Sequence, residues 1–299
     1  MMAKPTDLTP FRVTPGKKIR LKDYDTGWMQ AEGLKELGKE QSKQKASAML
    51  EQSLAELSNM QQLLYADDRY SLLIVFQAMD AAGKDGTIKH VMSGVNPQGC
   101  QVFSFKKPSA EELDHNFLWR FMKSLPERGR IGIFNRSYYE DVLVVKVHPE
   151  LIQALPDQPI GPSFWQDRYQ DINAFERHLQ RNGTIVLKFF LNVSKKTQKK
   201  RFMERLERPE KNWKFSAADL AERAHWDDYM AAYEQAINAT STEYAPWHII
   251  PADHKWVTRA LVAEVIVSAL RGLDLSFPKV NAEQLQLLAT ARAQLLDES

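Results

Sequence analysis

The chain has 299 residues, of which 43% are hydrophobic, and its 40 Lys and Arg nearly balance its 38 Asp and Glu, giving a formal net charge of +2. This composition argues against a disordered chain, and with 13 Gly and 14 Pro the chain is not collagen-like. Near-neutrality also argues against a broadly basic surface for nucleic acid or membranes, although the segment from Lys195 to Lys214 holds nine Lys and Arg against three Glu.

Residues 1–39 contain Pro and Gly without a clear period, and we expect them to form an N-terminal arm that lies on the body. From Glu40 to Tyr65 the apolar side chains are spaced as in an amphipathic helix. Ser71–Phe76 is a continuous apolar run, which is typical of a strand buried on both faces of a parallel sheet. Strands and helices alternate after it: strands are predicted at Gln101–Phe105, Arg130–Phe134, Thr184–Leu191 and Trp247–Ile250, and helices near Ile88–Val91, Glu111–Ser124, Trp165–Gln180 and Ala217–Thr240.

This alternation predicts an α/β fold with a doubly wound parallel sheet. The three prolines of Leu151–Ser163 indicate a loop, and two further helices are predicted at Trp256–Leu273 and Ala282–Leu296. We expect one main domain over residues 40–275 and a C-terminal helix within residues 276–299. Periodicity does not decide whether the first and last helices pack on the core or on a second subunit.

Cys100 is the only cysteine, so an internal disulfide and a cysteine-rich metal site are excluded. The first residues lack the apolar region of a secretion signal, and the longest apolar runs are far shorter than the ~20 residues of a membrane span. We therefore expect a cytoplasmic protein that does not enter a membrane.

A glycine-bearing loop follows the first predicted strand. Asp80-Ala81-Ala82-Gly83-Lys84-Asp85-Gly86-Thr87 lies between this strand and a predicted helix, the context in which backbone amides and a lysine bind phosphate. The match to a phosphate-binding (Walker A) loop is partial, because Ala78 replaces its first Gly and Asp85 replaces the Ser or Thr that binds Mg²⁺. A metal ion would then need a carboxylate such as Asp80, whose alternative role is that of an exposed helix cap.

A second polar segment, Asn135–Val142, follows the third predicted strand. Ligands of open α/β sheets bind at the carboxyl ends of the strands, so Arg136, Glu140 and Asp141 should face the same crevice as Lys84. A guanidinium and carboxylates beside a phosphate loop suit phosphoryl transfer, which depends on positioning and charge neutralisation. Alternatively, Arg136 and Glu140 form an ordinary ion pair, four residues apart on a surface helix.

The basic segment after the fourth strand, Lys195–Arg208, has the pattern of a helix, with Arg201, Arg205 and Arg208 on one face. Such a helix beside a phosphate site is typical of a lid, here expected at about residues 197–226, that closes over the phosphates and expels water. The alternative is a solvent-exposed helix whose charges pair along its surface. Nucleic acid is not the expected partner, because the segment lacks the spaced aromatic side chains that stack bases.

Four motifs, in this order, resemble those of the polyphosphate kinase 2 family. They cover roughly residues 11 to 272 and consist of Asp80–Gly86, Ser104–Ser109 with Phe117–Arg120, Phe134–Val142, and Pro209–Phe215 followed by Trp226–Tyr229. The resemblance implies a three-layer α/β/α, P-loop-kinase-like fold similar to thymidylate kinase, with a helical lid. It also implies dependence on Mg²⁺, with Mn²⁺ as an alternative, and direct in-line phosphoryl transfer between inorganic polyphosphate and a nucleotide.

The resemblance further implies roles for individual residues. Asp80, Lys84, Arg136, Glu140 and Asp141 would be catalytic, and the three carboxylates among them would also hold the metal. Polyphosphate and nucleotide would contact Ala81, Ala82, Gly83, Asp85, Gly86, Thr87, Lys106, Arg120, Arg201, Arg205, Lys211 and Lys214.

Three positions depart from the pattern of many members, since Asn135, Glu140 and Asp141 replace Asp, Asn and Arg. The departure resembles the subgroup, class III, that phosphorylates nucleoside mono- and diphosphates. It implies AMP, ADP and ATP as nucleotides, with guanine nucleotides as further candidates, and we expect a homo-oligomer. The alternatives are an ATP-dependent nucleoside monophosphate kinase, which Asp85 argues against, and a non-catalytic module that binds polyphosphate or RNA, for which the carboxylates would be dispensable.

Overall fold

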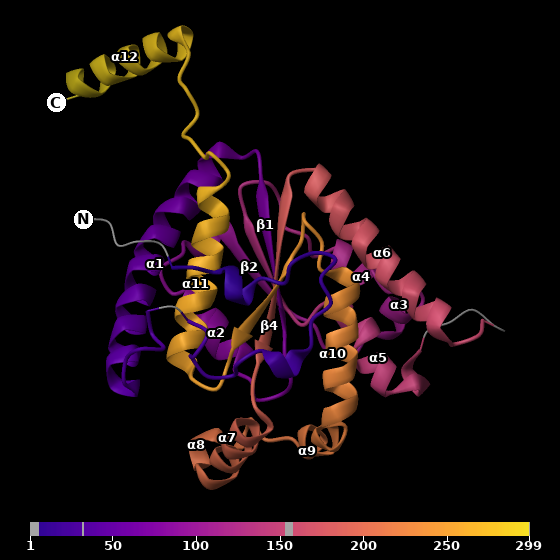
Figure 1. Ribbon diagram of the computed structural model, residues 1–299. Coiled ribbons are helices and arrows are strands. Elements are labelled where there is room, and N and C mark those ends of the chain that lie inside the picture. Colours follow the sequence, from indigo (N-terminus) through magenta and orange to yellow (C-terminus); the bar gives the residue numbers. More distant parts are fainter. Residues whose placement is uncertain (1–5, 32, 153–157, 299) are drawn as a thin grey trace.

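The computed structural model describes residues 6–31, 33–152 and 158–298. Its centre is a sheet of five parallel strands in the order β2-β3-β1-β4-β5 (Figure 1). The strands are β1 Ser71–Gln77, β2 Cys100–Ser104, β3 Ile131–Asn135, β4 Thr184–Asn192 and β5 Trp247–Pro251. The predicted α/β fold with a parallel sheet is confirmed, and the sheet order places β1 at the centre.

Helices cover both faces of the sheet and make three layers (Figure 1). One layer contains α1 Lys39–Asp67, α2 Lys84–Val91 and α11 Lys255–Arg271, and the other contains α5 Val144–Val147, α6 Pro162–Arg181 and α10 Trp226–Thr240. The helix predicted at Glu40–Tyr65 therefore packs within this chain, because α1 lies along α11. Every residue of β1 is buried, as a strand covered on both faces requires.

The N-terminal segment packs against the outer edge of the sheet. The Val13 amide donates to the Trp247 carbonyl oxygen at 2.8 Å, and Arg12 forms an antiparallel bridge with His248. Phe11 and Val13 are fully buried, so this segment completes the core beside β5. Burial of each such side chain contributes about 1.5–3 kcal/mol. Residues 1–5 and 32 of the predicted arm lie outside the described residues.

The prediction of one helix at Glu111–Ser124 is wrong. The segment forms two short helices, α3 Ala110–Leu113 and α4 Trp119–Met122. Between them the Asn116 side chain accepts a hydrogen bond from the Leu118 amide at 3.1 Å. A side chain that bonds the backbone in this way competes with the helical hydrogen bonds and favours a turn.

The helical pattern at Ala217–Thr240 is also divided, because α9 Ala217–Ala224 ends before His225 and α10 begins after it. The loop predicted at Leu151–Ser163 ends where α6 begins, and its residues 153–157 lie outside the described residues. These differences leave the sheet unchanged.

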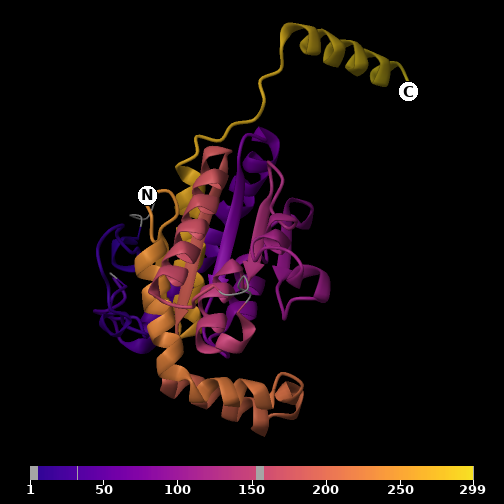
Figure 2. The same cartoon turned by 90° about the vertical axis from the view of Figure 1, so that its right-hand side faces the viewer.

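The last helix, α12 Ala282–Asp297, extends away from the body (Figures 1 and 2). A capping box between Asn281 and Gln284 begins this helix, while Leu285, Leu288 and Leu295 are exposed. In this chain α12 does not pack on the core, and a homo-oligomer stays a prediction. Despite its leucines, α12 is not a membrane span, since no helix in the described ranges has the length and apolar character needed to cross a membrane.

Candidate active site

The loop Ala78–Gly83 between β1 and α2, which we call the phosphate loop after its predicted role, turns sharply. Ala81 and Gly83 have positive φ angles of 59° and 107°, and α2 begins directly after Gly83. A φ of 107° strains any side chain, which explains the glycine at this position. Lys84 Nζ donates to the Ala78 carbonyl oxygen at 2.9 Å, so the loop folds around the ammonium group of Lys84. Burial lowers the pKa of Lys84, and the nearby Asp80 carboxylate opposes that effect.

Arg136 lies between two carboxylates. Its backbone has a positive φ of 66°, and its Nη2 lies 3.1 Å from Asp80 Oδ1. Its Nη1 lies 3.8 Å from Glu140 Oε2. The Glu140 carboxylate is the main cause of the raised pKa of Arg136. The Asp80 carboxylate raises this pKa further, whereas burial lowers it. The ends of β1 and β3 thus bring together Asp80, Arg136 and Glu140, as the sequence indicates.

Asp141 does not join this group, which corrects the expectation that Arg136, Glu140 and Asp141 face one crevice. Its Oδ1 lies 3.7 Å from Arg168 Nη1, and burial raises its pKa to about 6. The reason is the 3₁₀-helix over Tyr138–Val142, in which successive side chains point about 120° apart. Asp141 therefore faces α6 instead of the phosphate loop.

Arg120, which is expected to contact polyphosphate or nucleotide, packs against the segment after β2. Its Nη1 donates to the Lys106 carbonyl oxygen at 2.8 Å. Its guanidinium packs over the rings of Phe105 and Phe121, with 5.6 Å and 4.7 Å to the ring centres. Arg120 therefore positions the segment after β2 that carries Lys106.

Asn135, one of the three departures from the family pattern, bonds Asp85 at the start of α2. Its Nδ2 donates to Asp85 Oδ1 at 2.7 Å, across the gap between β3 and α2. An aspartate at position 135 would place two carboxylates in contact, whereas the amide supplies the donor that Asp85 needs.

The basic segment, for which a lid is predicted, folds into three helices, α7 Lys195–Glu207, α8 Pro209–Asn212 and α9 Ala217–Ala224, at the end of the body opposite α12 (Figure 2). We refer to these helices as the lid. Arg201 fixes the lid to the phosphate loop. Its Nη1 donates to the carbonyl oxygens of Ala81 and Ala82 at 2.9 Å and 2.6 Å, and its Nη2 donates to that of Ala252 at 2.6 Å. Arg201 thus joins the lid, the loop and the end of β5.

Arg205 and Lys211 are paired within the lid. Arg205 Nη1 lies 2.8 Å from Asp219 Oδ2, and Lys211 Nζ lies 3.2 Å from Glu204 Oε2. Lys211 is brought back to Glu204 because α8 folds against the end of α7. The sequence spacing allowed Glu204 to pair with a neighbouring cation along the surface of α7. It pairs with Lys211 of α8 instead.

Several groups at the site were missed by sequence reasoning. Asp219 lies on the lid, and its raised pKa comes from burial and then from the Asp80 carboxylate nearby. Tyr233 of α10 is buried close to Glu140. Burial raises the pKa of this tyrosine, and the Glu140 carboxylate raises it further. Lys255 begins α11 shortly after β5 ends, and the rule that ligands bind at the carboxyl ends of parallel strands could have identified it.

These elements enclose a cavity of about 720 Å³ at the carboxyl ends of the strands. Ten Lys or Arg side chains line it against three carboxylates. Apart from Glu140, Asp141 and Arg120, all the residues predicted for the site are among its lining residues. The lining consists of Asp80, Ala81, Ala82, Gly83, Lys84, Asp85, Gly86, Thr87, Ser104, Phe105, Lys106, Lys107, Asn135, Arg136, Arg201, Glu204, Arg205, Lys211, Trp213, Lys214, Lys255, Thr258 and Arg259.

A family model described as polyphosphate kinase 2 matches residues 40–277. The chain belongs to the polyphosphate kinase 2 family. It is 52% identical over 289 residues to an ADP-polyphosphate phosphotransferase of Rhodopseudomonas palustris, covering 96% of this chain and 97% of that protein. It is 46% identical to an AMP/ADP-polyphosphate phosphotransferase of Meiothermus ruber, covering 90% and 95%. The crystal structure of polyphosphate kinase 2 from Arthrobacter aurescens superposes with a TM-score of 0.85 at 40% identity, covering 96% of this chain and 95% of that one.

Kinases of the polyphosphate kinase 2 family are generally metal-dependent phosphotransferases. The carboxylates that meet at Arg136 suit a cation that prefers oxygen ligands, since Asp80 lines the cavity and Glu140 adjoins it. Among the described residues no three His, Cys, Asp or Glu gather closely enough to make a complete protein-only metal site. A metal at this place would therefore share its shell with substrate and water oxygens, as Mg²⁺ does.

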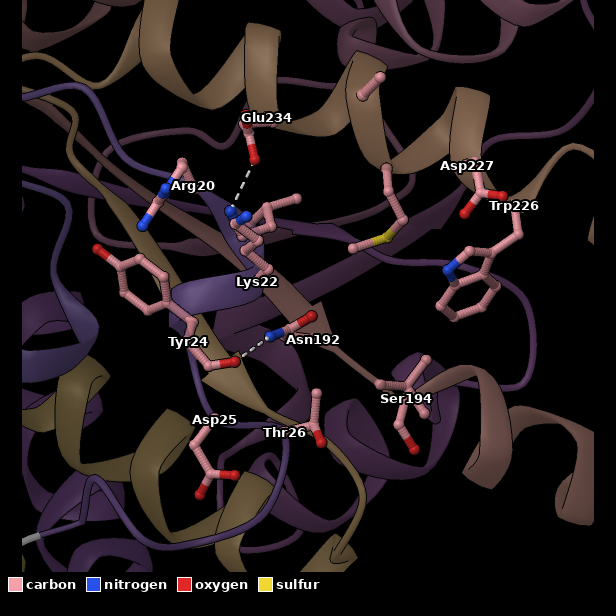
Figure 3. A pocket seen from close by; sticks show the side chains of 14 residues that line it. Arg20, Lys22, Tyr24, Asp25, Thr26, Asn192, Ser194, Trp226, Asp227 and Glu234 are labelled. Carbon is pink, nitrogen blue, oxygen red and sulfur yellow. Dashed lines mark hydrogen bonds between the residues drawn. The ribbon is translucent and has the colours of Figure 1, made fainter.

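A second hollow, of about 780 Å³, lies between the N-terminal segment and α10 (Figure 3). Its polar groups hold the N-terminal segment in place. Glu234 Oε2 accepts from the Leu21 amide at 2.8 Å, and Asn192 Nδ2 donates to the Tyr24 carbonyl oxygen at 3.2 Å. This hollow contains none of the residues predicted for the polyphosphate kinase 2 chemistry.

Proposed function

We propose that the protein transfers the terminal phosphoryl group of inorganic polyphosphate to nucleoside mono- and diphosphates, converting AMP to ADP and ADP to ATP. The observation that carries this proposal is the cavity, in which ten cationic side chains face three carboxylates beside the phosphate loop. The cations of the lining outnumber its carboxylates by seven, which exceeds the charge of a single nucleoside triphosphate. A linear chain of phosphates matches this excess.

In the proposed step, a terminal phosphate oxygen of the nucleotide attacks the terminal phosphorus of polyphosphate. The bond from that phosphorus to the next bridging oxygen breaks, and the chain leaves shorter by one phosphate. Lys84 and Arg136 stabilise the charge that spreads over the transferred group, which is where catalysis of phosphoryl transfer largely resides. Asp80 and Glu140 hold Arg136 in position. No phosphoenzyme is expected.

Mg²⁺ is the metal we propose, with Mn²⁺ as the alternative. Asp80 would hold it together with phosphate and water oxygens, and Glu140 would be close enough to bond its water shell. When bound, the ion neutralises charge on the phosphate oxygens. Asp141 has no part in this proposal, because it faces Arg168.

The proposed acceptors follow from the relatives and from the carboxylate at position 140. One relative is named for ADP alone and another for AMP and ADP. Glu140 beside Arg136 would hold a water shell in the space that a shorter acceptor leaves open, which supports use of both AMP and ADP. Guanine nucleotides are further candidates, since a relative from Pseudomonas aeruginosa is named a GDP-polyphosphate phosphotransferase. We propose a cytoplasmic location on the sequence features alone.

The test is a product assay with long-chain polyphosphate and Mg²⁺, with AMP, ADP, GMP and GDP as parallel acceptors. We expect ADP and ATP from AMP, and ATP from ADP. Activity with ATP as the donor and none with polyphosphate would indicate the ATP-dependent nucleoside monophosphate kinase instead. Polyphosphate binding without any nucleotide product would indicate the non-catalytic binding module.

A further inference from the structure

Apart from Lys84 and Arg136, which bond Ala78 and Asp80, the cations that line the cavity fall into two groups. In the first group the charge is already satisfied by the protein: Arg201 bonds backbone carbonyl oxygens, Arg205 bonds Asp219, and Lys211 pairs with Glu204. These side chains close the lid, so they have less capacity left for a ligand. The second group has no such partner and is available for an anion.

Lys255 and Arg259 belong to the second group and lie one turn apart at the start of α11. Within the described residues neither side chain makes an ion pair or a hydrogen bond. Burial, followed by the cations Arg201, Lys211 and Arg259, lowers the pKa of Lys255. The Glu204 carboxylate opposes this shift in the pKa of Lys255, but it pairs with Lys211. Cations that crowd one another in a partly buried cavity are stable when an anion binds between them.

The positions of Lys255 and Arg259 indicate how a linear ligand would run through the cavity. Asp80 and Arg136 mark one end, at the carboxyl ends of β1 and β3. The phosphate loop and the first turn of α2 form the middle. Arg259 Nη2 lies over this turn, 3.9 Å from the place that a Cβ on Gly86 would occupy. Lys255, one turn before Arg259, also lines the cavity and lies near the lid cations Arg201 and Lys211, where the start of α11 comes close to α2 (Figure 1).

We propose that Lys255 and Arg259 bind the polyphosphate chain behind the transferred phosphate and mark the path by which the chain leaves the cavity. The inference rests on the proposed function, because it takes the end with Asp80 and Arg136 as the place of transfer. A nucleotide bound there would block that end. The remaining phosphates of the donor must then extend over the phosphate loop toward the unpaired cations of α11.

Chain length provides the test. In the double variant Lys255→Ala/Arg259→Ala we expect KM for long-chain polyphosphate to rise about tenfold, which corresponds to about 1.4 kcal/mol of lost binding. We expect kcat to be unchanged, and KM for the shortest chain that the wild type accepts to change less than twofold. The salt dependence of long-chain binding should also weaken, because fewer phosphates are neutralised.

The matched control is Lys199→Ala/Lys200→Ala, which removes the same charge from exposed lid positions outside the cavity lining. An equal rise in KM for short and long chains, or an equal effect of the control, would overturn the proposal. Binding of labelled long-chain polyphosphate, measured by fluorescence anisotropy without nucleotide, keeps the test separate from the proposed function. If the wild type yields no product, weaker binding by the double variant still supports the polyphosphate path, and unchanged binding contradicts it.

Discussion

Lys188 Nζ lies 2.6 Å from Glu176 Oε2 in the centre of the protein, and neither side chain is exposed to solvent. Glu176 Oε1 accepts hydrogen bonds from the hydroxyls of Tyr138 and Tyr139 at 2.8 Å and 2.9 Å. These two tyrosines belong to the same short segment as the guanidinium and carboxylate of the site. A buried ion pair thus fixes the segment that presents Arg136 to the phosphate loop.

Removing one partner of this pair should destabilise the protein strongly, since it leaves the other charge buried without compensation. We expect Glu176→Gln and Lys188→Met each to lower the free energy of unfolding by about 3–5 kcal/mol. The double variant should lose less than the sum of the two, because no uncompensated charge remains. Urea unfolding of the four proteins measures this, and additive losses would show that the two groups are not coupled.

Replacing Asp80 by Asn separates catalysis from binding. The amide keeps the size of the side chain but loses the charge that holds Arg136 and that a metal ion requires. We expect kcat to fall about 10²- to 10³-fold, a loss typical of removing one preorganised electrostatic contact, while polyphosphate is still bound. Asp114→Asn, an exposed change on another loop, is the control. Turnover at the wild-type rate would remove Asp80 from the catalytic group.

Arg201 should be irreplaceable by lysine, although both carry one positive charge. The guanidinium bonds carbonyl oxygens of the phosphate loop and of the segment after β5 at the same time, a geometry that an ammonium group does not reproduce. Loss of charged hydrogen bonds worth about 1.5–3 kcal/mol predicts that Arg201→Lys lowers kcat/KM by about 10- to 100-fold. Arg208→Lys, on an exposed position of the same lid, should have no such effect. Steady-state kinetics of both variants decide the point.

Much of this architecture could be predicted from sequence, because the features that specify it are local. The apolar run before Asp80 and the one before Asn135 are strands of the parallel sheet, and such strands bring their carboxyl ends to one edge. That rule alone brings Lys84 and Arg136 together. The charge of the lid is likewise visible in the segment after β4.

The rest depends on side-chain direction and on distant partners, which spacing does not define. Glu140 and Asp141 are neighbours in sequence, yet one turns to Arg136 and the other to Arg168, because a 3₁₀-helix separates them by about a third of a turn. The contacts of Arg120 depend equally on the ring of Phe105, which only the folded chain brings near it.

His148 and Glu222 connect the lid to the body in a way that should depend on pH. His148 Nε2 lies 2.9 Å from Glu222 Oε2 of α9, and this hydrogen bond raises the pKa of the imidazole above its usual 6.5. Glu150 lies 3.2 Å from the other ring nitrogen, and the His225 ring centre lies 5.3 Å from that of His148. A raised pKa means that the contact is fully present below pH 6.5 and is lost as pH rises through the higher value.

We therefore expect the amides of α9 to exchange hydrogen more slowly at pH 6 than at pH 8, after correction for the intrinsic rate. In His148→Gln the corrected difference should largely disappear, since glutamine has no charge to lose. His178→Gln, an exposed change on α6, should retain the wild-type difference. A pH dependence that persists unchanged in His148→Gln would place the titrating group elsewhere, with His225 as the next residue to replace.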